Sequence, residues 1–424
     1  MKRKIYAAAA AAALCLLLIP GAAAAPDTSA DIPALAPAHP GLVGDAANGG
    51  TEAPRIITKT TVNADGSITT TATNLDTGTV TEVTTYADGS ILTVERLRDG
   101  QTTTTRQSAD GSVRREVRRT DGSLTVTEIR ADGSRASLET DEAGSQSWSV
   151  TLSQEAVEGA GEGAVSLPIR AIELGRSLEK ALPVTISVPR KGAVEVLLPL
   201  ESVPAGTLLY LAGEDGQWES LPYTAASNGV RFAVEDGGCV KVVNAAQSFS
   251  DVKTGDWFRD AVDYCSARGL LQGVGGGRFG PNETMSRGML VTALHRLSGE
   301  PAGEGGRDFA DVDSGAYYAA AVGWASGAGI VEGVGAGRFE PDAPITREQL
   351  AAILWRYVGS PAPESETLDF ADAAAAGDYA LPALCWAREQ GILSGKGENR
   401  MDPTGTALRC EAAKMLRGFL KRAE

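Results

Sequence analysis

Hydrophobic and polar positions follow three different patterns along this chain. Between residues 56 and 147, β-branched residues and threonines form short stretches such as ILTVERLR and LTVTEIR, separated by Asp-Gly pairs. Between residues 148 and 246, compact apolar runs stand between turn residues, which is typical of short buried strands. From residue 249 onward, apolar positions recur at helical spacing. The chain is therefore predicted to be multidomain, with two all-β regions followed by an all-α region.

The first β region is an eleven-residue repeat. Its Asp-Gly pairs begin at Asp65, Asp88, Asp99, Asp110, Asp121 and Asp132, with Asp76-Thr77-Gly78 between the first two. Asp-Gly tolerates the positive φ of tight hairpin turns, so each unit is predicted to be a turn plus a strand of about eight residues, together a β-meander or solenoid. Repeated acidic turns can also bind calcium, but the paired-glycine nonapeptide of calcium solenoids is absent and turn chemistry is favoured.

The second β region, residues 148–246, is predicted to be a small all-β sandwich or barrel. Its apolar runs lie at 184–188, 194–200, 207–212, 230–235 and 239–243. Turn residues separate these runs, and strands at this spacing are typical of a sandwich or barrel. The carboxylates of this region form no recognisable catalytic cluster in the sequence, so we expect them to be surface groups.

The third region contains three copies of a unit of about sixty residues, predicted at 247–305, 306–366 and 367–424. The copies begin with FSDV (249–252), FADV (309–312) and FADA (370–373). In each copy a helix is predicted to end at a glycine (Gly269, Gly329 and Gly391), where left-handed backbone closes the helix. Glycine-rich loops at 273–281, 333–341 and 395–403 then lead to a second helix.

The second helix is clearest in the middle copy. Thr346 and Gln349 have the spacing of a capping box, and an apolar face follows at Leu350, Ile353, Leu354 and Tyr357. A helix-loop-helix of this kind must bury its apolar faces against its neighbours, so the three copies should pack as one helical unit. His295, on the second helix of the first copy, is expected to face solvent.

These motifs together resemble the S-layer homology (SLH) domain family. The resemblance includes the segments MSRGM (285–289), ITREQ (345–349) and ALRCE (407–411), which correspond to a family motif written ITRAE. It covers residues 249–424, about two fifths of the chain. It implies a trefoil-like helical bundle that binds secondary cell-wall polysaccharide non-covalently in grooves between repeats, and so holds a secreted protein to a Gram-positive-type wall.

Six residues are candidates for binding such a polysaccharide: Arg287, Arg347, Arg409, Trp257, Tyr317 and Tyr379. The arginines open the second helices, where unpaired backbone N–H groups and the helix dipole favour an anion such as the carboxylate of an acidic or pyruvylated sugar. The aromatic residues open the first helices and can stack on sugar rings. The alternatives are a structural cap or ion pair for the arginines, and core packing for the aromatics. The grooves involving Arg347 are expected to be the most competent, because Met289 and Leu408 depart from the family pattern in the other copies.

The start of the chain is predicted to be a signal peptide, residues 1–25, followed by a flexible linker, residues 26–55. Three basic residues precede an apolar run from Ile5 to Ile19, which is shorter than the roughly 20 residues that span a bilayer. The linker is rich in proline, alanine and glycine. After cleavage four widely spaced cysteines remain, and we expect them to be buried free thiols.

Composition narrows the function. The formal net charge of −15 opposes binding to nucleic acid and to an anionic membrane, and only two histidines, His39 and His295, are available for catalysis or metal ligation. No metal, cofactor or catalytic residue is predicted, and the chain is not expected to be an enzyme. The preferred interpretation is a wall-anchored surface protein that displays its β region, with other surface-layer proteins left open as partners. The alternative is an adhesin whose β region binds an external protein or glycan.

Overall fold

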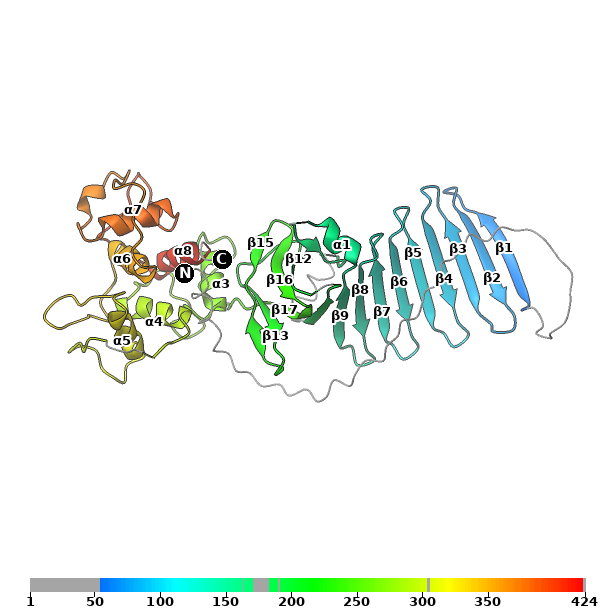
Figure 1. Ribbon diagram of the computed structural model, residues 1–424, viewed down its shortest axis with the longest axis horizontal. Helices are drawn as coiled ribbons and strands as arrows, with labels where there is room; N and C mark the ends of the chain where they lie inside the picture. The colour runs from blue at the N-terminus through cyan, green and yellow to red at the C-terminus, as the bar shows by residue number, and fades with distance from the viewer. Residues whose placement is uncertain (1–53, 162, 171–182, 190, 303–305, 422–424) are drawn as a thin grey trace.

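The computed structural model describes residues 54–161, 163–170, 183–189, 191–302 and 306–421. The predicted signal peptide and nearly all of the predicted linker lie outside these residues. The described part is elongated, with a sheet of repeats at one end, a β-sandwich in the middle and helices at the other end (Figure 1). The predicted order of two β regions followed by a helical region is confirmed.

The eleven-residue repeats form a β-meander. Strands β1 to β9 lie in sequence order, and each is antiparallel to the next. The strands have six or seven paired residues, fewer than the eight predicted, because the turns take more of each repeat. The first eight strands are β1 (Ile56–Val62), β2 (Ile68–Asn74), β3 (Val80–Thr85), β4 (Ile91–Arg96), β5 (Thr102–Gln107), β6 (Val113–Arg118), β7 (Leu124–Ile129) and β8 (Arg135–Thr140).

The turns explain why the repeat carries Asp-Gly-Ser. In the first turn the Asn63 carbonyl accepts from the N–H of Gly66 (3.0 Å), while the Asn63 N–H donates to the Ser67 carbonyl (2.8 Å). Gly66 has φ 82°, so it supplies the left-handed residue that completes this three-residue hairpin loop. Asp65 Oδ1 accepts from the Ser67 hydroxyl (2.7 Å) and N–H (3.0 Å), and these bonds lower the pKa of Asp65. The carboxylate is therefore used within its own turn.

The meander is a single layer of sheet without a hydrophobic core of its own (Figure 1). Strand β1 is exposed along its whole length, strands β2 to β6 are mostly half-buried, and buried apolar side chains begin only at β7, toward the sandwich. Cross-strand pairs hold the layer together, including the hydroxyls of Thr69 and Thr84 at 2.8 Å and an ion pair of Arg96 with Glu82 at 2.8 Å. Its order thus comes from turns and pairing between neighbouring strands.

The middle region is a β-sandwich, which decides between the two predicted alternatives. The meander sheet continues through β9 (Gln146–Thr151), which pairs in parallel with β11, so the predicted boundary at 147/148 falls inside a strand. The remaining elements are α1 (Gln154–Gly159), β10 (Val165–Ser166), β11 (Pro183–Ser187), β12 (Ala193–Pro199), β13 (Thr207–Ala212), β14 (Trp218–Ser220), β15 (Thr224–Ala226), β16 (Gly229–Glu235) and β17 (Gly238–Asn244). A second sheet, β10-β12-β16-β15, packs its apolar face on the end of the first, around Trp148. All five strands predicted from apolar runs are present.

The C-terminal region contains three pairs of helices. They are α3 (Arg259–Ala267) with α4 (Arg287–Leu297), α5 (Ala319–Gly327) with α6 (Arg347–Tyr357), and α7 (Leu381–Glu389) with α8 (Arg409–Leu420), and a 3-10 turn at Ala373–Ala375 precedes α7. The capping box of Thr346 and Gln349 is confirmed. The predicted closing glycines have φ between 68° and 70°. The second helix of each pair packs against the first helix of another pair: α4 on α5, α6 on α7 and α8 on α3.

Two smaller predictions have different outcomes. The prediction that His295 faces solvent is wrong: it is buried, its Nε2 lies 2.9 Å from the Pro301 carbonyl oxygen, and its ring packs on Trp324. The prediction of buried free thiols is confirmed for Cys265, Cys385 and Cys410, whereas Cys239 is a free thiol that is only partly buried. Burial raises the pKa of Cys265 to about 12 and that of Cys410 to about 11, so these thiols are poorly nucleophilic at neutral pH.

Replacing Trp148 with alanine tests the sandwich core. This ring is 2% exposed, so its loss leaves a large cavity, and we expect Trp148→Ala to lower the free energy of unfolding by about 3–5 kcal/mol. Trp218→Ala is the matched control, because Trp218 is 38% exposed on the edge strand β14 and should cost under about 1 kcal/mol. Urea unfolding followed by far-ultraviolet circular dichroism measures both changes. Equal losses would contradict this account of the core.

Candidate functional site

A closed ring of backbone hydrogen bonds lies at the centre of the helical region. The N–H of Met285 donates to the carbonyl of Ala407 (2.9 Å), Ala407 donates to Ile345 (2.8 Å), and Ile345 donates back to Met285 (2.9 Å). Each of these residues is fully buried and lies two positions before the first residue of α4, α6 or α8. The ring gives the three copies a three-fold arrangement that no single copy can form alone.

The N-termini of the second helices are occupied by the neighbouring repeat. In α6 the N–H of Arg347 donates to the Gly405 carbonyl (3.0 Å), and the N–H of Glu348 donates to the Pro403 carbonyl (2.9 Å). Equivalent bonds join α4 to residues 341 and 343 and α8 to residues 281 and 283. The prediction that these N–H groups are unpaired and favour an anion is therefore wrong, because loop carbonyls of the next repeat satisfy them.

The three predicted arginines are buried between repeats. The Nε of Arg347 donates to the Met401 carbonyl (2.7 Å) and its Nη2 to the Ser394 carbonyl (2.8 Å). The same two atoms of Arg287 bind the carbonyls of Phe339 and Glu332, and those of Arg409 bind the carbonyls of Phe279 and Gln272. Burial lowers the pKa of each guanidinium, and at Arg347 the charge of Glu411 opposes that shift. These contacts leave Nη1 as the part of each fork not bonded to the backbone.

The aspartates of the copy-opening motifs hold the loops that receive the arginines. Asp311 accepts from the N–H groups of Phe339 and Glu340, both at 2.8 Å, and the Phe339 carbonyl in turn accepts from Arg287. Burial acts to raise the pKa of Asp311, but these two backbone donors outweigh it, so the pKa is lowered. Asp251 and Asp372 make the equivalent bonds. Sequence reasoning missed this role, although the aspartate recurs at the same place in all three copies.

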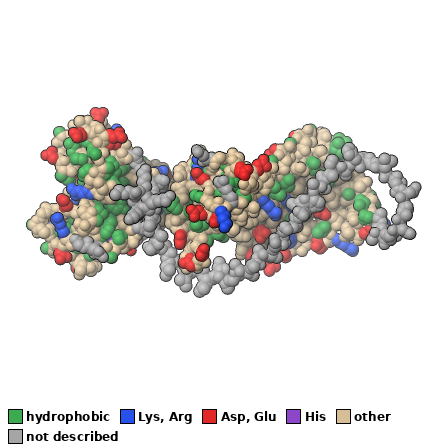
Figure 2. All heavy atoms as spheres, viewed as in Figure 1, with side chains coloured by type: hydrophobic (Ala, Val, Ile, Leu, Met, Phe, Trp, Pro, Cys, Tyr) green, Lys and Arg blue, Asp and Glu red, His purple; other side chains and the backbone are tan. Residues whose placement is uncertain are grey.

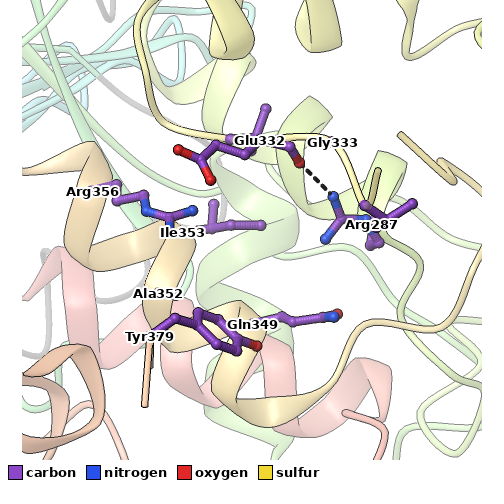
Figure 3. Close-up of a pocket in the computed structure, with 10 residues that line it drawn as sticks. Arg287, Glu332, Gly333, Gln349, Ala352, Ile353, Arg356 and Tyr379 are labelled. Carbon is purple, nitrogen blue, oxygen red and sulfur yellow. Dashed lines mark hydrogen bonds between the residues drawn. The ribbon is translucent and has the colours of Figure 1, made fainter. Parts of the chain in front are cut away.

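One groove joins residues from all three repeats (Figure 3). It has a volume of about 260 Å³, and its lining includes Arg287, Gln349, Arg356 and Tyr379. The Tyr379 ring is half exposed, and its hydroxyl donates to Oε1 of Glu348 (2.9 Å). Burial, then the hydrogen bond and charge of Glu348, raise the pKa of Tyr379 to about 12. The hydroxyl therefore stays protonated and keeps the ring at the rim of this groove, which we call groove 1.

A second groove, groove 2, is more strongly basic. It encloses about 300 Å³, and its lining includes Trp257, Arg347, Lys396, Glu411 and Lys414. Glu411 is shared between Lys396 (3.1 Å) and Nη1 of Arg347 (3.6 Å). Lys414 lies 5.2 Å from the centre of the Trp257 ring, which is 59% exposed. Three cations and one carboxylate leave the lining of groove 2 positively charged. For the helical end as a whole, Figure 2 shows a hollow between two lobes with basic side chains in view.

Arg409 and Tyr317, the remaining predicted arginine and aromatic residue, form a surface that is less polar than grooves 1 and 2. The two interact electrostatically, and Tyr317 is 61% exposed. Met289 stands where grooves 1 and 2 have Gln349 and Glu411, and its sulfur lies 3.6 Å from Nη1 of Arg409. The structure therefore combines Arg287 with Tyr379, Arg347 with Trp257 and Arg409 with Tyr317, each arginine with an aromatic from a different repeat.

Three basic groove residues escaped the sequence analysis: Arg356, Lys396 and Lys414. Lys414 occupies the position of Thr292 and Ala352 in the other copies, five residues after the buried arginine. Aligning the three copies position by position would have shown that only the third copy has a lysine there. The sequence alone did not indicate that these positions face a groove, because the second wall of each groove comes from another repeat.

Comparison with known proteins identifies the helical region. The family model of the S-layer homology domain matches residues 248–288 and 308–351. The helical region therefore contains S-layer homology domains. Its similarity to the Surface-layer 125 kDa protein of Lysinibacillus sphaericus is 31% identity over 180 residues, 41% of this chain and 15% of the relative. The S-layer protein sap of Bacillus anthracis is 26% identical over 210 residues, 46% of this chain and 24% of the relative.

Enzymes also occur among the relatives of this chain. The Amylopullulanase of Thermoanaerobacterium thermosulfurigenes is 28% identical over 270 residues, which is 61% of this chain but 14% of the relative. The matches to such enzymes lie mainly in the S-layer homology region, and the chain spans about a seventh of the Amylopullulanase. Family and relatives together indicate association with the cell surface or cell wall. No helix among the described residues has the length and apolar character needed to cross a bilayer.

The buried arginines can be tested by their effect on stability. Arg347→Met removes donors from the carbonyls of Met401 and Ser394 and leaves Glu411 with one cation fewer, so we expect the free energy of unfolding to fall by about 3 kcal/mol. Arg356→Met, at the wall of groove 1, should change it by less than about 1 kcal/mol. Guanidinium unfolding of the two variants provides the measurement. If Arg347→Met proves as stable as the wild type, the interlocking role of the arginine is wrong.

Proposed function

We propose that this chain is a secreted surface protein of a Gram-positive-type bacterium, held non-covalently to secondary cell-wall polysaccharide by three S-layer homology repeats. Grooves 1 and 2 support the proposal, because each combines cationic side chains with an exposed aromatic ring. An aromatic face stacks on a sugar ring, and a cation pairs with the carboxylate of an acidic or pyruvylated sugar. The proposed role is anchoring and display of the β region, without a catalytic step.

The third helix pair completes these grooves, so we propose that residues 367–424 are a third repeat. The family model does not extend to this segment, but α7 and α8 enter the same ring through Ala407 and the same arginine contacts through Arg409. This segment also supplies Tyr379 to groove 1 and both lysines to groove 2. Without it, groove 1 would lose its aromatic ring and groove 2 would lose both of its lysines.

Groove 2 is proposed as the principal binding site, and one observation carries this choice. Lys396 and Arg347 pair with the single carboxylate of Glu411, and Lys414 lies beside the exposed ring of Trp257 in the same lining. The chain has a net charge of −15, which repels an acidic polymer at long range, but at physiological salt that field decays within about 8 Å. Local cations therefore decide the interaction with an acidic sugar, and groove 2 presents the most of them.

Binding to isolated walls tests the proposal. The full chain is incubated with walls stripped of protein, before and after chemical removal of their accessory polysaccharide, and retention is measured by sedimentation. We expect the double variant Lys396→Gln/Lys414→Gln to bind about tenfold more weakly, because a loss of about 1.4 kcal/mol from two charge contacts is a factor of ten. Raising the salt concentration should weaken the wild type in the same direction.

A matched variant separates the groove from general charge effects. Arg296→Gln removes a cation on α4, outside both grooves, and should reduce retention by less than about twofold. Equal retention on walls without polysaccharide would overturn the anchoring proposal. Loss of binding in Arg296→Gln equal to that of the double lysine variant would overturn the choice of groove 2.

A further inference from the structure

The described sheets have four edges, and three of them are short. The edge strands β14, β10 and β15 have three, two and three residues. Short edge strands offer few unpaired backbone groups, which is one way in which proteins prevent edge-to-edge association. The fourth edge, β1, has seven residues and lies at the far end of the meander from the helices (Figure 1). It is the one long edge among the described residues.

Within the described residues, strand β1 also lacks a bulge, a proline and a cluster of charges, which are other common protections of an edge. It pairs residue for residue with β2 without a bulge, contains no proline, and carries Lys59 as its single charge. Three of its apolar side chains are exposed to solvent: Ile56 (52%), Ile57 (59%) and Val62 (70%). Ile68 of β2 and Leu75 just beyond it extend this apolar surface. The outer end of the sheet is therefore regularly paired, apolar and nearly uncharged.

The hairpin bonds fix which backbone groups of β1 are free. Asn63 and Arg55 exchange hydrogen bonds with the β2 side, so the odd-numbered residues of β1 point their N–H and C=O groups toward β2. The even-numbered residues Ile56, Thr58, Thr60 and Val62 point theirs outward. An antiparallel strand placed on this side could form backbone hydrogen bonds with these four residues. The bonds would alternate along the strand as they already do between strands β2 to β8.

We propose that the free edge of β1 pairs with β1 of a second copy of this chain, antiparallel and about a two-fold axis. A second copy fits because β1 belongs to the same repeat as the interior strands of the meander, each of which pairs with a repeat strand on both sides. A β1 strand from another copy would therefore continue the meander. The strongly negative chain does not oppose the contact locally, since β1 and β2 contain no acidic residue. The pairing does not depend on the proposed wall binding.

The single charged residue of β1, Lys59, decides the register in which the two β1 strands would pair. An axis at Lys59 would place the two lysine side chains directly opposite each other, which is unfavourable. An axis at Thr60 places Lys59 opposite the partner's Thr61 and Val62 opposite the partner's Thr58. Val62, the most exposed apolar side chain of the strand, then gains a cross-strand neighbour. We therefore place the axis at Thr60.

The consequence is a weak dimer with its helical regions at opposite ends. One strand pair buries less than the roughly 1,200 Å² of a stable interface, so association in solution should need a high protein concentration. The helices lie at the end of the molecule opposite β1 (Figure 1), so a dimer presents two anchoring regions. Two linked binding sites bind a surface more tightly than either alone, and dense display would in turn favour the pairing.

Substitutions at Thr60 test the pairing through the backbone. Thr60→Pro removes the outward N–H without breaking a backbone bond to β2, whereas Thr60→Ala keeps that N–H. Both variants lose the contact between the hydroxyls of Thr60 and Thr70 (3.2 Å), so this loss cancels in the comparison. By sedimentation velocity, the wild type and Thr60→Ala should shift from the monomer mass toward twice that mass as the concentration rises into the high micromolar range. Thr60→Pro should associate at least tenfold more weakly, and Thr60→Lys, which puts a charge at the axis, should do the same if the proline variant folds poorly.

Disulfide cross-linking tests the register. Across the proposed axis the two Thr60 Cα atoms would be about 5.5 Å apart, which a disulfide can span. Under oxidising conditions Thr60→Cys should give a covalent dimer, while Thr93→Cys, on the same face of the interior strand β4, should not. If Thr93→Cys cross-linked as fast as Thr60→Cys, the proposed axis at Thr60 would be wrong.

Several results would overturn the proposal itself. A wild type that stays monomeric throughout, a Thr60→Pro variant that associates as tightly as Thr60→Ala, or growth beyond a dimer would each contradict two-fold pairing. Association that appears only after deletion of residues 26–53 would mean that this segment covers the edge instead. That segment contains four prolines, which cannot donate to a β-ladder, and so is a poor strand donor.

Discussion

The guanidinium groups buried between repeats are the contacts on which the helical region depends. Each repeat ends its glycine-rich loop with carbonyl oxygens that the arginine of another repeat must satisfy, and the three contacts close into a circle with the backbone ring of Met285, Ile345 and Ala407. Removing one repeat would leave the other two with unsatisfied groups, and a buried guanidinium without partners is costly. The region is therefore expected to fold as a unit of three, or not at all.

The same interlocking decides what the grooves can contain. Because two of the three nitrogens of each arginine fork bind backbone carbonyls, much of the positive charge available to a ligand comes from other positions, such as Lys396, Lys414 and Arg356. The scaffold residues are thus alike in the three copies, while the groove residues are not. This separation allows the three grooves to differ in charge and polarity without disturbing the fold, and groove 2 is the most basic result.

The two ends of the molecule achieve order by opposite means. The helical end buries a large apolar cluster and uses contacts between residues more than fifty positions apart. The meander has no such cluster, and its information is local: a turn fixed by Asp65, Gly66 and Ser67, then a strand paired with its neighbour in sequence. A single layer built in this way can be extended by repeats, and its last strand keeps an edge that another chain can pair with.

The sequence by itself determined what depends on near neighbours. It predicted the Asp-Gly turns, the five strands of the sandwich, the capping box of Thr346 and Gln349, and the three helix pairs, since propensity and hydrogen bonds within a few residues set these features. It did not predict that Arg347 donates to Met401 or that Asp311 holds the loop at Phe339. Which carbonyl a buried side chain reaches, and which wall of a groove lies opposite, depend on how the repeats close around the three-fold ring, and only the tertiary structure decided that.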